Sequence, residues 1–309
     1  MHDTVANELQ GADESAAARR ASRRLRVPCR SRRVRLRERD LDILLALAKM
    51  RLLRTSDLAA LYFEAKGTCQ KRMRKLYDAG LVRAVVTDLA AENRYVLTGL
   101  GHEFVARALP EGAVPPYRPA PRVDGRSVAH LDLLNRYRIA LARGAAEDCV
   151  ELSSFLPEWE LRAREPHAPL VPDAAVRLGY AGAGLQLALE VDVGTEPPTL
   201  VLKKVERYEA AALQGHAVCG LLRPVVLFVA SSARRARSIS RAVGPISSRR
   251  VLVGALPWVL QDGGVRSGLA FPTGLARCDA VPGVDAYDLG LLEVLREPGR
   301  DGVAGARLL

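Results

Sequence analysis

In the first third of the chain, apolar residues recur at helical spacing in three consecutive segments. Leucine and isoleucine fall every three or four positions over residues 41–52, which predicts an amphipathic helix. A second helix is expected at 56–63, after an N-capping Thr-Ser-Asp sequence. A third is expected at 68–79, where Gly80 supplies the glycine that commonly follows a helix end.

Two alternating apolar runs and a further helix follow these segments. The runs at 81–86 and 93–97 flank a polar turn and predict two short strands. Thr98 then caps a helix expected at 99–109. Three helices followed by a two-stranded wing are the winged helix-turn-helix arrangement. Residues 35–109 are therefore predicted to form a DNA-binding domain of that type.

The third helix of such a domain enters the major groove of double-stranded DNA. Polar side chains there reach base edges, and cationic side chains reach phosphates. The residues predicted to contact DNA from this helix and from the wing are Thr68, Gln70, Lys71, Arg72, Arg74, Lys75, Arg83 and Arg94. Thr68 and Gln70 would approach bases, and the basic residues would contact phosphates. The alternative is a winged helix that is used for protein contacts.

The second half of the chain alternates strands and helices. Residues 110–126 hold five prolines and no periodic pattern, which is typical of a linker. Beyond it, a helix, a strand and a hairpin precede a helix, a strand, a helix and a last strand. This order predicts a mixed sheet flanked by helices over 127–260, so the chain is expected to be α/β (α+β overall). The segment 261–309 is expected to be a C-terminal extension to which the pattern assigns no role.

The predicted hairpin gathers acidic residues at one end of one sheet face. Side chains alternate along a strand, so Glu190 and Asp192 share a face. Reflection through a turn near Gly182 brings Asp173 beside Val191. Carboxylates this close repel one another, which raises their pKa values unless a cation joins them. Mg²⁺ or Mn²⁺, held by Asp173 and Glu190 with a substrate phosphate, would suit such a site. An exposed sheet face with solvated acids has the same spacing.

Composition and charge narrow the choice of partner. The 309 residues are 49% hydrophobic and 26% charged, with a net charge of +11, which favours an anionic partner and nucleic acid first. An arginine-rich composition in a GC-rich genome would give the same excess. Ten arginines and no acid lie between Arg19 and Arg37, so residues 1–34 are expected to be a disordered basic arm.

Two further features bear on the location of the protein. No apolar run reaches the length of a membrane span, so no membrane partner is expected. The five scattered cysteines contain no CxxC pair and fit reduced thiols. Both features predict a cytoplasmic protein.

The acid pattern resembles the PD-(D/E)xK nuclease superfamily. Pro172-Asp173 matches the first half of its motif and Glu190 matches the acid of the second, while Asp192 stands where the lysine usually lies. The resemblance implies a catalytic set of Asp173, Glu190 and Asp192, with the lysine moved to the following helix. Lys203 is the candidate for that lysine. Glu160 is the candidate for an upstream acid that joins the metal site.

Over residues 38–230 the chain also resembles the replication-relaxation family of bacterial plasmids and integrative elements. The resemblance rests on a winged helix, a proline-rich linker and the sequences H-L-x-x-x-N-x-x-R, E-W-E and P-D-A. Its most specific piece is L-E-V-D-V-G-T-E at 189–196, followed by Lys203 and Tyr208. It implies DNA processing on a mobile element.

Two kinds of function are compatible with these features. The first is a Mg²⁺-dependent DNA nuclease or nickase that the winged helix places on duplex DNA. The second is a non-catalytic DNA-binding replication accessory, or a transcription regulator, with a degenerate nuclease-like domain. The missing Glu-x-Lys lysine motivates the second, because one fold can host many functions.

Overall fold

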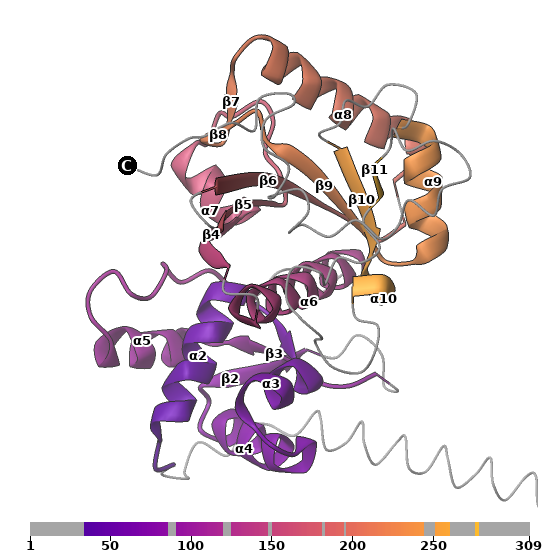
Figure 1. Cartoon of the computed structure of the whole chain (residues 1–309). Helices are drawn as coiled ribbons and strands as arrows, with labels where there is room; N and C mark the ends of the chain where they lie inside the picture. Colours follow the sequence, from indigo (N-terminus) through magenta and orange to yellow (C-terminus); the bar gives the residue numbers. More distant parts are fainter. Residues whose placement is uncertain are drawn as a thin grey trace, which may run out of the picture. The chain divides into compact units, whose positions relative to one another are not determined.

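The computed structural model of the chain describes residues 34–85, 91–119, 125–147, 150–180, 183–194, 196–243, 251–259 and 276–277. Contacts between residues divide the chain into two units, Met1–Asn135 and Arg136–Leu309 (Figure 1). The predicted basic arm lies outside the described residues except for Val34. The predicted C-terminal extension lies outside them except for residues 276–277.

The first unit contains a three-stranded antiparallel sheet with the strand order β1-β3-β2. Its elements in chain order are α2 (Glu38–Met50), β1 (Leu53–Arg54), α3 (Thr55–Tyr62), α4 (Lys66–Asp78), β2 (Val82–Val85), β3 (Arg94–Leu97) and α5 (Gly99–Ala108). Each helix and strand expected between residues 41 and 109 is present. The short strand β1 is an addition that the apolar pattern does not predict.

The helices of this unit pack through their apolar stripes. Fully buried side chains of its core include Ile43, Leu44, Leu47, Met73 and Leu76. Burial of one such side chain stabilises the fold by about 1.5–3 kcal/mol. The turn between α4 and β2 passes through Gly80, whose φ of 75° is accessible to glycine at little cost. Thr98 caps α5 by accepting a hydrogen bond from the Gly101 N–H at 3.0 Å.

The segment predicted as a linker contacts the first unit. The carbonyl oxygen of Pro115 lies 2.8 Å from His102 Nε2, and that of Pro119 accepts a hydrogen bond from Arg51 at 3.0 Å. Tyr117 stacks at a tilt on His102, with ring centroids 5.4 Å apart. The described part of this segment is therefore held against the helices that precede it.

The boundary between the units lies inside helix α6 (Gly125–Glu147), between Asn135 and Arg136, rather than within residues 110–126. The side-chain amide of Asn135 donates hydrogen bonds to the carbonyl oxygens of Met50 at 3.0 Å and Leu52 at 2.6 Å. These bonds satisfy backbone groups at the end of α2. The N-terminal part of α6 thus belongs to the first unit.

The second unit is built on a six-stranded mixed sheet with the order β11-β10-β9-β6-β5-β4. Its strands are β4 (Glu151–Pro157), β5 (Ala174–Tyr180), β6 (Ala183–Asp192), β9 (Val225–Ala230), β10 (Val251–Ala255) and β11 (Ala276–Arg277). The pairs β6–β9 and β9–β10 are parallel, and the other pairs are antiparallel. A separate pair is formed by β7 (Ala217–Val218) and β8 (Leu221–Leu222).

Helices α8 (Pro198–Leu213) and α9 (Ala233–Val243) cover one face of this sheet (Figure 1). One buried cluster joins strand and helix side chains, among them Ala188, Val205, Tyr208, Phe228 and Ile239. Because side chains alternate along β6, Glu190 and Asp192 lie on the same face as Ala188. The sheet face that carries the acids is therefore covered by helices.

Two short helices complete the described part of this unit, namely α7 (Glu158–Arg164) and α10 (Leu256–Val259). The chain is thus a mixed α/β protein, as predicted. None of the described helices combines the length and the apolar character that a membrane span requires.

Candidate functional site

The β5–β6 hairpin brings Asp173 to the end of β6. Ala174 pairs with Leu189 in the hairpin register, and the Val191 N–H donates a hydrogen bond to Asp173 Oδ2 at 2.7 Å. Val191 is the neighbour that reflection of the sequence through the turn predicts. Asp173 is half-buried and directly precedes β5, so it lies beside Glu190 on β6.

Glu190 is buried beneath α8 and is only 2% exposed. The Tyr208 hydroxyl donates to its Oε1 at 2.7 Å, and the Lys204 ammonium donates to its Oε2 at 3.0 Å. Helical residues four apart lie on one face, so both donors point from α8 toward the strand. Both oxygens of this buried carboxylate therefore have partners within the protein.

Lys204 takes the place that the sequence assigned to Lys203, and this prediction is corrected by the structure. Lys203 is exposed on α8, whereas Lys204 is partly buried and contacts Glu190. Consecutive helical residues point about 100° apart, so only one of the two lysines can face the sheet. The buried residues Val201, Val205 and Tyr208 mark the inward stripe. Lys204 borders that stripe, whereas Lys203 lies on the opposite side of the helix.

The pKa values of Glu190, Lys204 and Tyr208 are shifted by their burial and by the charges around them. Burial, and after it the negative charge of Asp173, raise the pKa of Glu190 to about 7, although Lys204 and Tyr208 act in the opposite direction. Burial also opposes the charge on Lys204, but attraction to Glu190 and then to Asp173 outweighs it and raises the pKa of that lysine. Burial and the adjacent Glu190 carboxylate raise the pKa of Tyr208. The group is thus a coupled set of acid, cation and phenol.

Asp192 does not join this cluster, which corrects the prediction of three converging acids. Its two oxygens accept hydrogen bonds from Arg235 of α9, at 2.8 Å from Nε and 2.7 Å from a terminal nitrogen. Its Oδ1 also accepts the Gly194 N–H at 2.6 Å. Asp192 and Glu190 share a sheet face as predicted, but α9 holds the first and α8 the second.

Glu160, the predicted upstream acid, lies on α7 and is half-buried. The charged group with which it interacts is Arg138 of α6. Arg138 itself lies over the ring of Phe155, 4.8 Å from the ring centre. The structure therefore associates Glu160 with Arg138.

Protein donors bond to the acids around the predicted magnesium or manganese site. Mg²⁺ requires oxygen ligands together with open positions for water or substrate phosphate. Glu190 has both oxygens bonded to Tyr208 and Lys204, and Asp192 has both bonded to Arg235. Within the described ranges, no three histidine, cysteine or acidic residues stand together as a metal site. Protein cations occupy the positions next to these acids.

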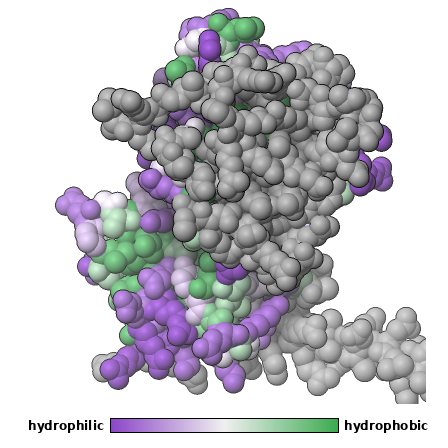
Figure 2. Space-filling view, in the orientation of Figure 1, coloured by the Kyte–Doolittle hydropathy of each residue, from purple (hydrophilic) through white to green (hydrophobic). Residues whose placement is uncertain are grey.

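The predicted recognition helix, α4, presents a polar and basic surface. Cys69, Met73 and Leu76 face the core of the first unit. The exposed residues on the other side include the predicted contacts Thr68, Gln70, Lys71 and Lys75. Figure 2 shows hydrophilic residues gathered over the part of this unit where α2 and α4 lie. Arg83, on β2, is also exposed.

Two arginines predicted to contact DNA are held inside the first unit instead. Arg72 donates from Nε to Asp40 Oδ1 at 2.6 Å and from a terminal nitrogen to the other oxygen, and Asp40 is 1% exposed. Arg94 donates to Asp132 of α6 at 2.7 Å, with its own side chain 16% exposed. Their guanidinium groups form internal ion pairs, which corrects their predicted role.

Arg74 is intermediate between the exposed lysines of α4 and the arginines that form internal ion pairs. It forms an ion pair with Asp78 at 2.8 Å and lies over the ring of Tyr77, yet 42% of its side chain is exposed. An ion pair this exposed adds little stability, because water screens it.

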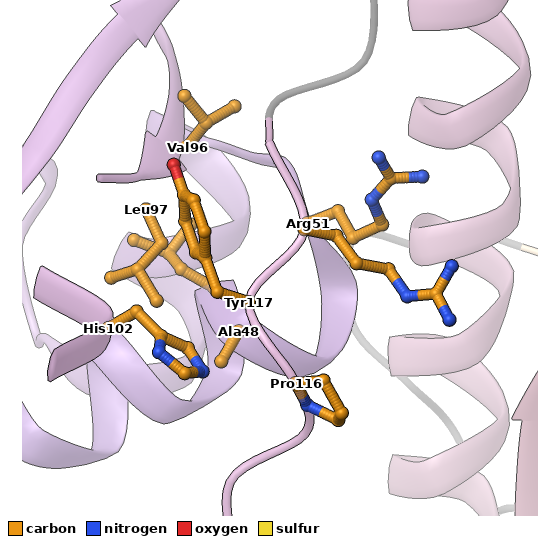
Figure 3. Close-up of a pocket in the computed structure, with 9 residues that line it drawn as sticks. Ala48, Arg51, Val96, Leu97, His102, Pro116 and Tyr117 are labelled. Atoms are coloured by element: carbon orange, nitrogen blue, oxygen red, sulfur yellow. The ribbon is translucent and has the colours of Figure 1, made fainter. Parts of the chain in front are cut away.

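A small pocket lies on the first unit between α2, β3 and the segment after α5 (Figure 3). His102, Tyr117 and Arg51 are among its lining residues. Its space of about 10 Å³ is roughly that of a single water molecule. The pocket is therefore too small for an organic ligand.

Comparison with known protein families gives a match over more than half of the chain. The replication-relaxation family matches residues 44–220, more than half of the chain. The matched range contains α4, the β5–β6 hairpin and the Glu190–Lys204–Tyr208 cluster. No curated protein and no solved structure matches.

Proposed function

Because the chain belongs to the replication-relaxation family, we propose that it is a double-stranded DNA-binding protein that acts in the replication or relaxation of a plasmid or another mobile element. Membership of the family suggests the process. The observation that supports DNA binding is the exposed face of α4, which combines lysines with Thr68 and Gln70.

The element order of the first unit supports a winged helix-turn-helix. Helices α3 and α4 precede the hairpin β2–β3, and the sheet order β1-β3-β2 is the order expected if that hairpin is a wing. In this fold the helix before the wing enters the major groove. We assign that role to α4, whose apolar side is buried in the core and whose polar side is exposed.

The exposed residues of this surface divide into two chemical kinds. Lys71 and Lys75 of α4 and Arg83 of β2 carry charges suited to phosphates. Thr68 and Gln70 have hydrogen-bonding groups suited to base edges, and Gln can bond adenine in the major groove through two atoms. The basic residues would hold the duplex and the neutral ones would read it.

We further propose that the second unit is a nuclease-like domain that acts without catalysis. The hairpin β5–β6 next to the parallel strands β9 and β10, flanked by α8 and α9, supports that fold. Lys204 and Arg235 neutralise the acids that a metal would need. This arrangement favours a structural role for Glu190 and Asp192 over metal binding.

The proposal is tested by binding of fluorescently labelled duplex DNA, measured by anisotropy. The wild type is expected to bind, with affinity that falls steeply as salt rises. Lys71→Ala/Lys75→Ala is expected to bind more weakly at every salt concentration, whereas Glu190→Gln is expected to bind like the wild type. Absence of binding by the folded wild type would contradict the proposal.

A second candidate function is Mg²⁺-dependent nicking of DNA. It is favoured by the clustering of Asp173, Glu190 and Lys204, the residue types of a PD-(D/E)xK site. Supercoiled plasmid incubated with Mg²⁺ or Mn²⁺ separates the candidates. Nicking by the wild type that is lost in Asp173→Ala would support the nuclease. Intact plasmid, and a melting temperature that metal does not raise, would support the non-catalytic domain.

A further inference from the structure

Helix α9 of the second unit has a second basic surface that no predicted site includes. Its sequence, ARRARSISRAV, contains four arginines and no acid. Arg234, Arg237 and Arg241 are exposed, while Arg235 turns inward to Asp192. Residues at spacings of three and seven share one face of a helix. The exposed arginines therefore form a single stripe.

The orientation of this stripe is fixed by contacts on the opposite side of the helix. Ala236, Ile239 and Val243 are fully buried in the cluster shared with the sheet. At the start of the helix, Arg235 donates two hydrogen bonds to Asp192 at the end of β6. The Ser231 N–H donates to the Asp192 carbonyl oxygen at 2.8 Å. The buried apolar residues and the bonds to Asp192 together fix the rotation of α9, so its arginine face points outward.

We propose that Arg234, Arg237 and Arg241 are a second DNA-backbone contact surface, which rests on the proposed function and adds the second unit to it. The stripe runs about 10 Å along the helix axis at 1.5 Å per residue. Arginine binds phosphate oxygens through two parallel N–H groups, and each such contact on DNA releases counterions.

The choice of DNA backbone follows from the residues that accompany the arginines. Residues 233–243 contain no asparagine or glutamine, the side chains that bond to adenine in the major groove. They also contain no exposed aromatic or leucine that would enter a lipid surface. Helix α8 beside it mixes signs, because Lys203 and Arg207 alternate with Glu206 and Glu209. The uniform charge of α9 is thus suited to sequence-independent contact with phosphates.

The test is the salt dependence of duplex binding by the full chain. Arg234→Gln/Arg237→Gln/Arg241→Gln is compared with Arg162→Gln/Arg164→Gln/Arg223→Gln, which removes the same charge from other exposed arginines of this unit. The slope of log affinity against log salt is expected to become shallower by about 2–3 in the first variant, at about 0.9 per phosphate contact. The second variant is expected to keep the wild-type slope. Equal slopes in the two variants would overturn the proposal.

Three further arms keep the outcome unambiguous. Each single Arg→Gln change on α9 is expected to make the slope shallower by about 1, so a misfolded triple variant does not end the test. Arg234→Lys/Arg237→Lys/Arg241→Lys keeps the charge and is expected to keep most of the slope. The triple Arg→Gln variant is also tested on anionic lipid vesicles. If it loses lipid binding but binds DNA like the wild type, the proposal is overturned in favour of a lipid partner.

Failure of this inference is distinct from failure of the proposed function. A wild type that binds DNA and needs Lys71 and Lys75, but whose slope does not depend on the α9 arginines, would contradict only the inference. A folded wild type that binds no DNA would contradict both.

Discussion

Helices α4 and α9 distribute their basic residues in the same way. Each turns one arginine inward onto a buried aspartate, Arg72 onto Asp40 in the first unit and Arg235 onto Asp192 in the second. Each leaves its other basic residues at least partly exposed. A buried aspartate supplied by another element therefore decides which arginine stabilises the fold and which can meet a ligand.

The two helices differ in the neutral residues of their exposed faces. On α4, Thr68 and Gln70 lie among the lysines. On α9, the neutral polar residue next to the exposed arginines is Ser238. Hydrogen bonds to base edges specify sequence, and contacts to phosphates only position a protein. The proposal therefore assigns base reading to α4 and contact with the DNA backbone to α9.

The largest expected effect comes from removing an inward arginine. Arg72→Met and Arg235→Met each leave a buried aspartate without its cation. Loss of one partner of a buried ion pair costs about 3 kcal/mol. Urea unfolding should show this loss for the unit that contains each change.

Neighbouring outward residues provide matched controls for this prediction. Lys71→Met beside Arg72, and Arg234→Met beside Arg235, should change the free energy of unfolding by less than about 0.5 kcal/mol. If the inward and outward changes cost the same, the division between the two roles does not hold.

A smaller effect is expected from the buried acid that pairs with lysine. Since the pKa of Glu190 is raised to about 7, its stabilising contribution is complete below its unfolded pKa near 4.3 and is lost as pH rises through 7. The wild type should therefore lose stability relative to Glu190→Gln between about pH 4.5 and pH 8. Unfolding free energies measured at several pH values check this, and a constant difference between the two proteins would contradict it.

Base reading by α4 should give an effect of similar or smaller size. Gln70→Ala is expected to reduce the preference for the best duplex over a random one by about 1–2 kcal/mol. Lys71→Ala should weaken all sequences alike. Competition binding with a randomised duplex pool measures both, and an unchanged preference in Gln70→Ala would remove Gln70 from the reading surface.

The smallest effect is expected at the inward arginine of the wing. Arg94→Gln should leave the salt dependence of DNA binding unchanged, because Arg94 is bonded to Asp132. Arg83→Gln, on the adjacent strand, should make the slope of log affinity against log salt shallower by about 1. Anisotropy titrations at several salt concentrations compare the two, and the opposite ranking would show that the wing meets DNA through the other arginine.

Much of the fold can be predicted from the sequence, because its periodic apolar patterns are long and the residues that end helices or form turns are easily recognised. The stripes of α2 and α4, the glycine after α4 and the hairpin β5–β6 all agree with the local pattern. The register that brings Asp173 to Val191 also follows from the sequence, since the turn position fixes it. Local information is sufficient for each of these features.

The partners of charged side chains could not be predicted in the same way. Arg72 and Asp40 are 32 residues apart, and Arg94 and Asp132 are 38 apart, so no local pattern connects them. The proline-rich segment before α6 also suggested a domain boundary there. Asp132 was therefore assigned to a different domain from Arg94. The choice of Lys204 over Lys203 could have been made from the sequence, because Lys204 borders the apolar stripe of α8 and Lys203 lies opposite it.

DNA contact through the exposed basic residues of α4 is the central proposal, and the salt dependence of duplex binding tests it most directly. Lys71→Ala/Lys75→Ala should make the slope of log affinity against log salt shallower by about 2. Lys49→Ala/Arg107→Ala, which removes equal charge from exposed positions on α2 and α5, should leave the wild-type slope. The same slope for both double variants would contradict the assignment of α4 as the DNA-binding helix.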